Sequence, residues 1–390
     1  MSTLETVLRQ VKTRVTPTDG ERQKMSRLSG RLKGDVERIL MESGFSATVS
    51  LQGSFARDTW VSGETDLDIF ARFSPSMDRN EWTDKVLPAI KNGLRKYKVI
   101  ERYAEHPFLE FHDDGVRVNI VPCYMVEKGN WKSATDRTPY HTEFMIAHLT
   151  PELRVEARLL KKFAKGIGVY GAEIKIGGFS GMLIDTLALY YHSFQETIRH
   201  ASSWTKDVRI EIGRPESREE SKKSEKGIDL IVIDPVDPDR NLAAAVRPGK
   251  LWNFVAASRQ FLLSPDAQYF FPPAFKKKTR KEFSRSIENS GRELVAIAFR
   301  HAALVQDVLW GQLMKVERSL VEMATREEFQ VFRSALWSSG NTESAVLLEV
   351  DRTALSNARL QKGPPVAKRG DSQSFLEPNL AARDTIRGPW

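Results

Sequence analysis

The chain has 390 residues, with 59 Lys or Arg, 51 Asp or Glu and a formal net charge of +8. Its length suffices for two to four domains. The excess of basic residues is consistent with binding to a polyanion such as RNA, and it is equally consistent with plain solubility. The single cysteine, Cys123, excludes a disulfide framework or zinc cluster within the chain. We find no apolar run that would span a bilayer and no signal peptide, and therefore expect a cytoplasmic protein without a membrane partner.

The N-terminal part alternates between helix and strand patterns. Residues 2–14 predict a short helix, and Thr16 is expected to cap a longer amphipathic helix that ends near Gly44. The pattern that follows predicts a helix at 79–96 and strands at 48–52, 66–73, 98–103, 107–112 and 116–124. This order predicts a helix-backed mixed sheet within a first domain of residues 1–148.

Two short motifs in this region indicate chemistry. The segment 53–57, GSFAR, is typical of a tight turn whose backbone and hydroxyl cradle a phosphate. Asp66 and Asp68 lie two apart in a predicted strand, so both carboxylates project from one face. Paired carboxylates repel unless a cation lies between them, which predicts magnesium bound to a nucleoside triphosphate. A D-x-D strand alone is commoner on a solvated face, but the preceding turn with Arg57 favours a nucleotide-transfer site.

Further blocks resemble the polymerase-β nucleotidyltransferase superfamily and, within it, the archaeal-type (class I) CCA-adding tRNA nucleotidyltransferases. The two motifs are followed by a strand ending VPCY at Tyr124, as in that superfamily. The other similar blocks are AEHP at 104–107, RTPYH at 137–141, RLLK at 158–161, VYGAE at 169–173, GFSG at 178–181, DPVD at 234–237 and RN at 240–241. The resemblance implies an α+β fold with a polymerase-β-like palm at 1–148, a helical central domain that binds nucleotide and tRNA at 149–265, and a C-terminal RNA-binding body at 266–390.

The resemblance also implies a reaction and a site. The reaction is template-independent addition of C, C and A to the 3′ end of tRNA from CTP and ATP, with Mg²⁺ as the cofactor. Asp66, Asp68 and Asn119 would be the catalytic metal ligands. The nucleotide-binding residues would be Ser54, Arg57, His106, Thr138, His141, Lys161, Tyr170 and Arg240. A homodimer is an assembly that the resemblance allows.

Asn119 departs from the family pattern, in which a third carboxylate would stand at this position. Asn keeps a carbonyl oxygen that can coordinate a cation but removes one negative charge. Asp113 and Asp114 lie in the predicted turn, and Glu110 is expected to form a cross-strand ion pair with Arg117, so none of them replaces this carboxylate. Two interpretations stay open: an active enzyme with a weaker metal site, or a catalytically impaired homologue that binds tRNA.

The central region reads as helical. Its cations Arg154, Arg158, Lys161 and Lys165 step by four, three and four, which places them on one helix face. The bend at 166–171 matches G-x-G-x-x-G, but a charged helix precedes it, so we do not interpret it as a dinucleotide site. One helix is predicted at 179–204, a surface loop at 214–226 and a strand at 228–234.

Three of the residues named by the resemblance have a plainer interpretation. His106 and His141 are as consistent with hydrogen-bonded structural histidines as with nucleotide contacts. The planar fork of donors on Arg240 would read the edge of C or A, but an ion pair with Asp237 or Asp239 is the alternative.

The C-terminal part changes in character after Pro272. A basic cluster at 276–281 beside aromatic residues favours RNA contact modestly over a solvated face. Strand, helix, strand and strand patterns at 293–299, 305–323, 328–338 and 344–350 predict a small ferredoxin-like unit. Family members would continue beyond Trp390, so we expect a shortened tail. A poly(A) or oligo(U) polymerase, which would share the palm but not stop after three additions, is the other enzyme that the sequence leaves open.

Overall fold

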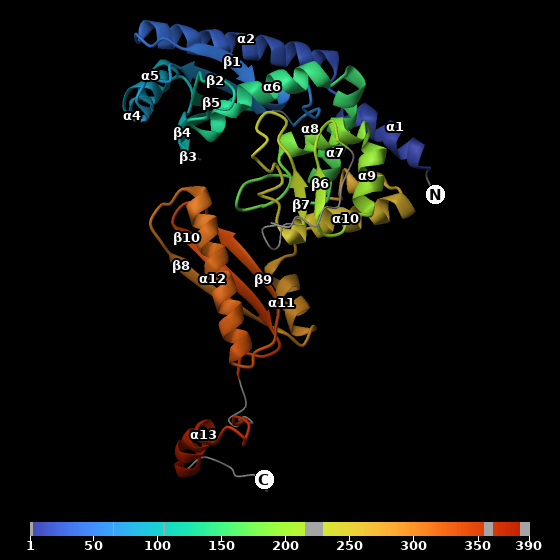
Figure 1. Ribbon diagram of the computed structural model, residues 1–390, viewed down its shortest axis with the longest axis vertical. Helices are drawn as coiled ribbons and strands as arrows, with labels where there is room; N and C mark the ends of the chain where they lie inside the picture. The colour runs from blue at the N-terminus through green and yellow to red at the C-terminus, as the bar shows by residue number, and fades with distance from the viewer. Residues whose placement is uncertain (1–2, 65, 104–105, 215–228, 355–361, 383–390) are drawn as a thin grey trace. The chain divides into compact units, whose positions relative to one another are not determined.

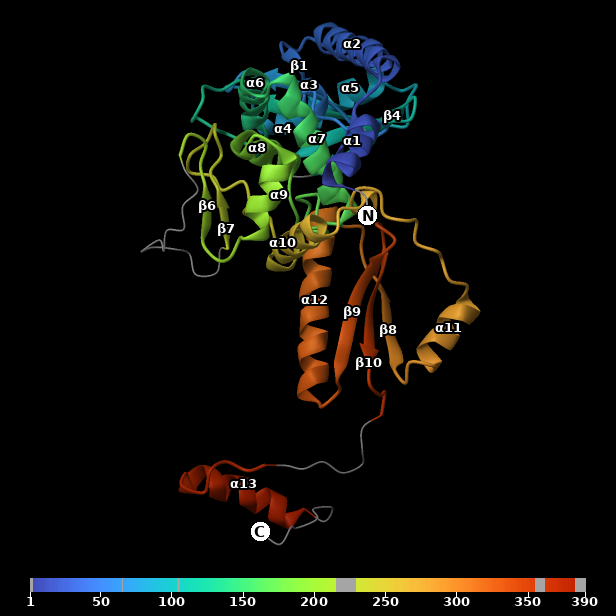
Figure 2. The same cartoon turned by 90° about the vertical axis from the view of Figure 1, so that its right-hand side faces the viewer.

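Two units make up the protein in the computed structural model, which describes residues 3–64, 66–103, 106–214, 229–354 and 362–382. The larger unit comprises residues 1–277, 302–314 and 340–342, and the smaller comprises 278–301, 315–339 and 343–390. Helices and strands alternate in both, which confirms the predicted α+β class (Figures 1 and 2). In the part of the chain that the structure describes, every helix is too short or too polar to cross a bilayer.

A five-stranded mixed sheet forms the N-terminal part of the larger unit. Its strands are β1 (Thr48–Gln52), β2 (Asp66–Phe73), β3 (Ile100–Tyr103), β4 (Pro107–Asp113) and β5 (Val116–Tyr124), in the order β1-β2-β5-β4-β3. Strands β2 and β5 are parallel, and the other neighbours are antiparallel. The parallel register places Asp66 opposite Arg117 and Asp68 opposite Asn119. The sheet thereby brings the two predicted acidic positions beside the position of the missing carboxylate.

Helices cover the apolar face of this sheet. Leu67 and Ile69 point into that face and are fully buried, which leaves Asp66 and Asp68 on the opposite face. Helices α2 (Asp19–Glu42) and α5 (Leu87–Gly93) pack against the same core, and α2 lies along the sheet in Figure 1. The carboxylates are therefore held on a strand whose inner side is fixed by packing.

Two details of the helices predicted in the N-terminal part are wrong. Thr18 rather than Thr16 caps α2, because Glu21 completes a capping box with Thr18 and not with Thr16. The preceding helix α1 spans Leu4–Val15. The predicted helix at 79–96 is instead α4 (Arg79–Glu81), a π-helical turn at Trp82–Val86 and then α5, with the Trp82 ring fully buried.

The rest of the larger unit is mainly helical. It contains α6 (Arg137–His148), α7 (Pro151–Gly166), α8 (Gly181–Tyr191), α9 (Phe194–Ser202) and α10 (Pro248–Leu263), with a short parallel pair β6 (Val208–Ile210) and β7 (Leu230–Val232). Phe163 of α7 packs edge to face against the rings of Phe194 and Phe261 at 5.6 and 5.5 Å. The helix predicted at 179–204 is broken because His192 adopts a left-handed conformation with φ 62°. Most of the loop predicted at 214–226 lies outside the described residues.

The smaller unit is built on a three-stranded antiparallel sheet. Strands β8 (Glu293–Arg300), β9 (Val331–Ser338) and β10 (Glu343–Val350) follow the order β8-β10-β9. Helix α12 (Gln306–Arg326) lies between β8 and β9 in sequence and belongs to this unit from residue 315 onward, where its Leu320 and Val321 pack on Val346 and Leu348. The order along the chain is the predicted strand, helix, strand and strand. The spatial order β8-β10-β9 is that of three neighbouring strands in a ferredoxin-like sheet. Helices α11 (Arg280–Glu288) and α13 (Arg369–Ala381) precede and follow it in sequence.

Candidate active site

The phosphate-binding turn predicted at 53–57 follows directly from β1. The chain leaves β1 at Gln52 and forms the single helical turn α3 (Gly53–Ala56). Gly53 has φ 71°, and a Cβ there would lie 2.0 Å from Oδ2 of Asp68. Only glycine allows this approach, so the turn that carries half-buried Ser54 lies directly against one acidic side chain.

Both acidic side chains lie on β2, and each is paired with a side chain of the neighbouring strand β5. The Asn119 amide donates from Nδ2 to Oδ1 of Asp68 at 2.9 Å. Arg117 donates to Asp66. The predicted ion pair between Arg117 and Glu110 is wrong, because β4 places Glu110 opposite Asn119, where it pairs with Arg102 at 2.9 Å.

The charges on the sheet face that carries Asp66 and Asp68 favour the binding of a cation. Burial raises the pKa of Asp68, the neighbouring Asp66 charge adds to the rise, and the hydrogen bond from Asn119 opposes it. The bond to Asp66 raises the pKa of the Arg117 guanidinium. Among the described residues, no three His, Cys, Asp or Glu side chains come together as a metal-binding group. Two carboxylates and an amide carbonyl are nevertheless hard oxygen ligands, and Gly53 lets Oδ2 of Asp68 lie directly against the phosphate turn, so this donor set fits a divalent ion.

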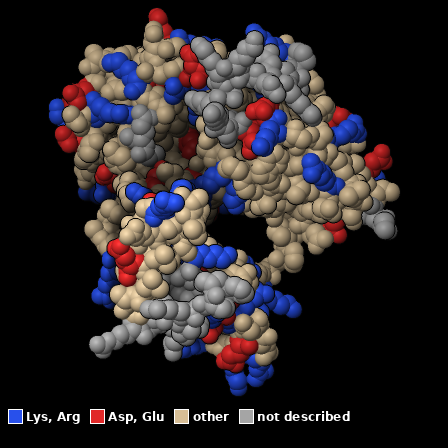
Figure 3. All heavy atoms as spheres, turned by 60° about the horizontal axis from the view of Figure 1, so that its bottom comes forward, with Lys and Arg blue, Asp and Glu red and all other residues tan. Residues whose placement is uncertain are grey.

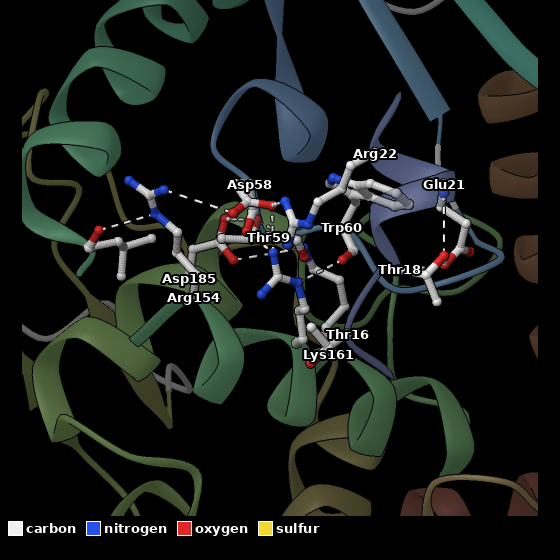
Figure 4. A network of polar contacts seen from close by, with 12 residues as sticks. Thr16, Thr18, Glu21, Arg22, Asp58, Thr59, Trp60, Arg154, Lys161 and Asp185 are labelled. Atoms are coloured by element: carbon white, nitrogen blue, oxygen red, sulfur yellow. Dashed lines mark hydrogen bonds and ion pairs between the residues drawn. The ribbon is translucent and has the colours of Figure 1, made fainter. Parts of the chain in front are cut away.

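A second, basic cluster forms around Asp185 of α8, whose carboxylate is fully buried (Figure 4). Arg57 donates from Nε to Oδ2 of Asp185 at 2.9 Å. Lys161 of α7 donates from Nζ to the Thr59 carbonyl at 2.8 Å and lies 3.7 Å from Oδ1 of Asp185. Two residues expected at the triphosphate are thus brought together, by an acid that the sequence analysis missed. Its signal was a single carboxylate in the apolar helix GMLIDTLALYY.

The row of cations on α7 packs on the segment that follows the phosphate turn. Arg158 is buried and donates to the Asp58 carboxylate and, at 2.9 Å, to the Trp60 carbonyl. Arg22 of α2 reaches the same carboxylate at 2.7 Å, as Figure 4 shows. Lys165 pairs with Glu64 at 2.9 Å. This helix face therefore contacts protein rather than solvent.

The two predicted histidines are both buried and hydrogen-bonded. His106 lies 2.8 Å from the Thr135 hydroxyl through Nε2, and its ring packs edge-on against Trp82. His141 contacts Asp234 at 2.8 Å through Nε2. Although burial alone would raise it, the pKa of Asp234 is lowered by the hydrogen bond from His141. Both rings have the contacts expected of structural histidines.

Of the remaining predicted residues, Arg240 lines a cavity of about 670 Å³ at the start of α8. The ion pair of Arg240 is with Asp234 at 3.0 Å rather than with Asp237 or Asp239. Tyr170 is half-buried, and its hydroxyl lies 3.0 Å from where a Cβ on Gly181 would be. Half-buried Thr138 lies in the first turn of α6.

Three family models match consecutive parts of the chain. A nucleotidyltransferase domain matches residues 33–141, the second domain of tRNA nucleotidyltransferases matches 155–271, and the C-terminal domain of CCA-adding enzymes matches 290–388. A solved structure of a cytoplasmic RNA terminal U-transferase is similar in fold, with a TM-score of 0.53 at 14% identity over 69% of this chain and 98% of that one.

Curated relatives extend over nearly the whole chain. The CCA-adding enzyme of Methanosarcina acetivorans is 34% identical over 381 residues, which is 96% of this chain and 82% of that protein. That of Pyrobaculum neutrophilum is 35% identical over 391 residues, which is 100% of this chain and 88% of that protein. At this identity and coverage, the chain belongs to the CCA-adding tRNA nucleotidyltransferases of the archaeal type.

Proposed function

We propose that this protein adds C, C and A to the 3′ end of tRNA from CTP and ATP without a nucleic acid template. The observation that carries the proposal is the glycine turn at 53–57 held against Asp68, in a chain similar to CCA-adding enzymes over nearly its full length. Such a turn brings a phosphate cradle beside metal-binding carboxylates, which is the arrangement that nucleotidyl transfer requires.

The family implies a divalent metal ion, and we propose that it is Mg²⁺. Asp66, Asp68 and the Asn119 carbonyl would hold it. When bound, the ion would lower the pKa of the attacking 3′-hydroxyl and neutralise charge on the triphosphate. No side chain needs to act as a general base, so the protein's part is to orient the nucleotide and the RNA terminus.

The roles of the other residues follow from where they lie. Ser54 and the backbone of its turn would bind phosphate oxygens, with Arg57 and Lys161 supplying positive charge beside them. Tyr170 would contact the sugar, and Arg240 would read the base from the rim of the cavity of about 670 Å³. The other proposed nucleotide-binding residues are Thr138, His106 and His141, and the hydrogen bonds of the two histidines would fix the walls of the pocket.

RNA binding would involve the central and C-terminal parts. We propose a palm at 1–148, a central nucleotide- and tRNA-binding domain at 149–265 and an RNA-binding body at 266–390, acting in the cytoplasm and able to pair as a homodimer. On the face drawn in Figure 3, Lys and Arg are interspersed with Asp and Glu rather than gathered in one patch. The net charge of +8 therefore supports a distributed attraction to tRNA.

Arg117 and Asn119 support a second candidate, a tRNA-binding homologue with impaired catalysis. Asn119 replaces the third carboxylate of the family pattern, and Arg117 neutralises the charge of Asp66 through their ion pair. Incubation with Mg²⁺, CTP, ATP and tRNA lacking its terminus tests both candidates. Extension by three nucleotides is expected, and a longer product would indicate a poly(A) or oligo(U) polymerase. No extension at any metal concentration, with activity gained in Asn119→Asp, would establish the impaired homologue.

A further inference from the structure

Asp185 occupies a place that packing alone does not explain. It is the only ionisable side chain of α8 (GMLIDTLALYY) apart from tyrosine, and it is fully buried among the Leu and Ile side chains of that helix. Burying a carboxylate is costly unless charged or hydrogen-bonding partners compensate. Here the partners are Arg57 and Thr59, from the segment that leaves the phosphate turn, and Lys161 from α7.

The contacts are unequal between the two carboxylate oxygens. Oδ2 accepts from Arg57 Nε at 2.9 Å and from the Thr59 hydroxyl at 3.1 Å. Oδ1 has no hydrogen-bond partner among the described residues, although it is buried, and it faces Lys161 Nζ at 3.7 Å. The ammonium group thus lies between this oxygen and the Thr59 carbonyl, which it contacts at 2.8 Å.

We propose that Asp185 is a positioning residue for nucleotide binding, a buried counter-ion that orients Arg57 and holds Lys161 charged beside the triphosphate. This inference rests on the proposed function, in which both cations bind phosphate. The bond from Arg57 uses Nε, and within the described ranges its Nη1 and Nη2 make no hydrogen bond to protein. The four N–H donors on those nitrogens would therefore be available to phosphate oxygens in a fixed plane.

The charge on Lys161 depends on this carboxylate. Burial lowers the pKa of Lys161 to about 8, and Asp185 acts against that shift. Among the described residues, the other charges that act most strongly on the ammonium are positive: Arg57 from the turn, and Arg158 and Lys165 from its own helix. Without Asp185, three cations and a dry environment would all favour the neutral amine, which binds phosphate poorly.

Binding of CTP with Mg²⁺, measured by calorimetry between about pH 7 and 9.5, tests the proposal, together with KM and kcat for extension. In the wild-type protein the affinity is expected to fall as pH rises through about 8, where Lys161 loses its proton. Asp185→Asn is expected to raise the dissociation constant at neutral pH by at least about tenfold, the scale of one charge-assisted hydrogen bond, and to move this fall to lower pH. Asp185→Glu is expected to restore the wild-type pH dependence in part, and kcat at saturating CTP is expected to change less than KM.

Glu156→Gln is the matched control. Glu156 lies on α7 with Lys161, and it accepts from Lys12 Nζ at 2.7 Å and from the Phe194 backbone amide at 2.9 Å. Its neutralisation removes a partly buried acid that joins three elements, and is expected to lower the melting temperature without moving the pH dependence of CTP binding. A purely structural role for Asp185 would give the Asp185→Asn variant the same result.

The outcomes separate the inference from the proposed function. If the wild-type protein binds no CTP, the proposed function fails. If it binds CTP and Asp185→Asn leaves both affinity and pH dependence unchanged, the inference is overturned. If Asp185→Asn does not fold, Thr59→Val decides, because it keeps the charge of Asp185 and removes the hydroxyl that lies 3.1 Å from Asp185 and 3.3 Å from Lys161. Weaker CTP binding is expected in this variant, and unchanged affinity and pH dependence would overturn the inference.

Discussion

Replacing Asn119 by Asp puts a third carboxylate beside Asp68, and its effect depends on metal. Without metal, the change removes the 2.9 Å hydrogen bond from Asn119 to Asp68, which is worth about 1.5–3 kcal/mol for a charged acceptor. It also sets two like charges within hydrogen-bond distance of each other. Their repulsion is about 4 kcal/mol at 4 Å and an effective dielectric constant of 20, and proton uptake limits it. We expect the free energy of unfolding at neutral pH in EDTA to fall by roughly 2–4 kcal/mol.

Magnesium should reverse this penalty, because a divalent ion compensates the added charge. In a thermal unfolding assay with increasing Mg²⁺, Asn119→Asp is expected to gain more stability than the wild-type protein, with the midpoint of the titration at least about tenfold lower. The magnesium concentration for half-maximal CCA addition should fall in parallel. Asn289→Asp, which adds the same charge at an exposed position, should show neither effect. If the Asn119→Asp variant were as stable as wild type in EDTA and gained no more from Mg²⁺, Asn119 would not face the metal.

Three further changes test the geometry of the site. Gly53→Ala places a Cβ 2.0 Å from a carboxylate oxygen of Asp68 at φ 71°, so we expect CCA addition to fall by about a hundredfold or more, an effect of about 3 kcal/mol in extension assays. Arg117→Ala releases Asp66 from its ion pair, so half-maximal activity should need several-fold less Mg²⁺; an increased requirement would show that Arg117 supports the site. Asp234→Asn should lower the free energy of unfolding by about 3–5 kcal/mol at neutral pH. Because the pKa of Asp234 is lowered, its stabilisation is present above pH 4 and is lost on further acidification, so the wild-type and variant curves should converge there.

The strands that carry the acids could be predicted from the sequence to the residue. In the first half of β2 and of β5, apolar buried residues alternate with polar residues, and in the second half of each strand neighbouring residues are buried on both faces. The partner of Arg117 could not be predicted, because it depends on register. The hairpin between β4 and β5 places Glu110 opposite Asn119, and the parallel pairing with β2, which is not local in sequence, delivers Arg117 to Asp66.

Other features depended on tertiary structure in the same way. The helical spacing of apolar residues runs through His192, so only the left-handed backbone there reveals the break between α8 and α9. The role of Asp185 could not be predicted, because its partners Arg57 and Lys161 lie 128 and 24 residues away in sequence. A buried acid in an apolar helix shows that a cation is nearby, but the sequence does not say which one.

The charges around the phosphate turn are compensated within the protein and separated by sign. On the sheet side, Arg117 and Asn119 satisfy Asp66 and Asp68; on the helical side, Asp185 satisfies Arg57 and approaches Lys161. A nucleotide bound with a metal ion would exchange both sets of partners at once, because its cation competes for the acids and its phosphates compete for the bases. The free energy of binding is then the difference between the free site, whose charges are paired within the protein, and the occupied site, whose charges are paired with metal and phosphate. A single added or removed charge in the protein therefore changes this difference noticeably. In the proposed site, Asn119 would weaken the competition for metal and Asp185 would strengthen the competition for phosphate. Variants at these two positions should therefore change metal affinity and phosphate affinity separately.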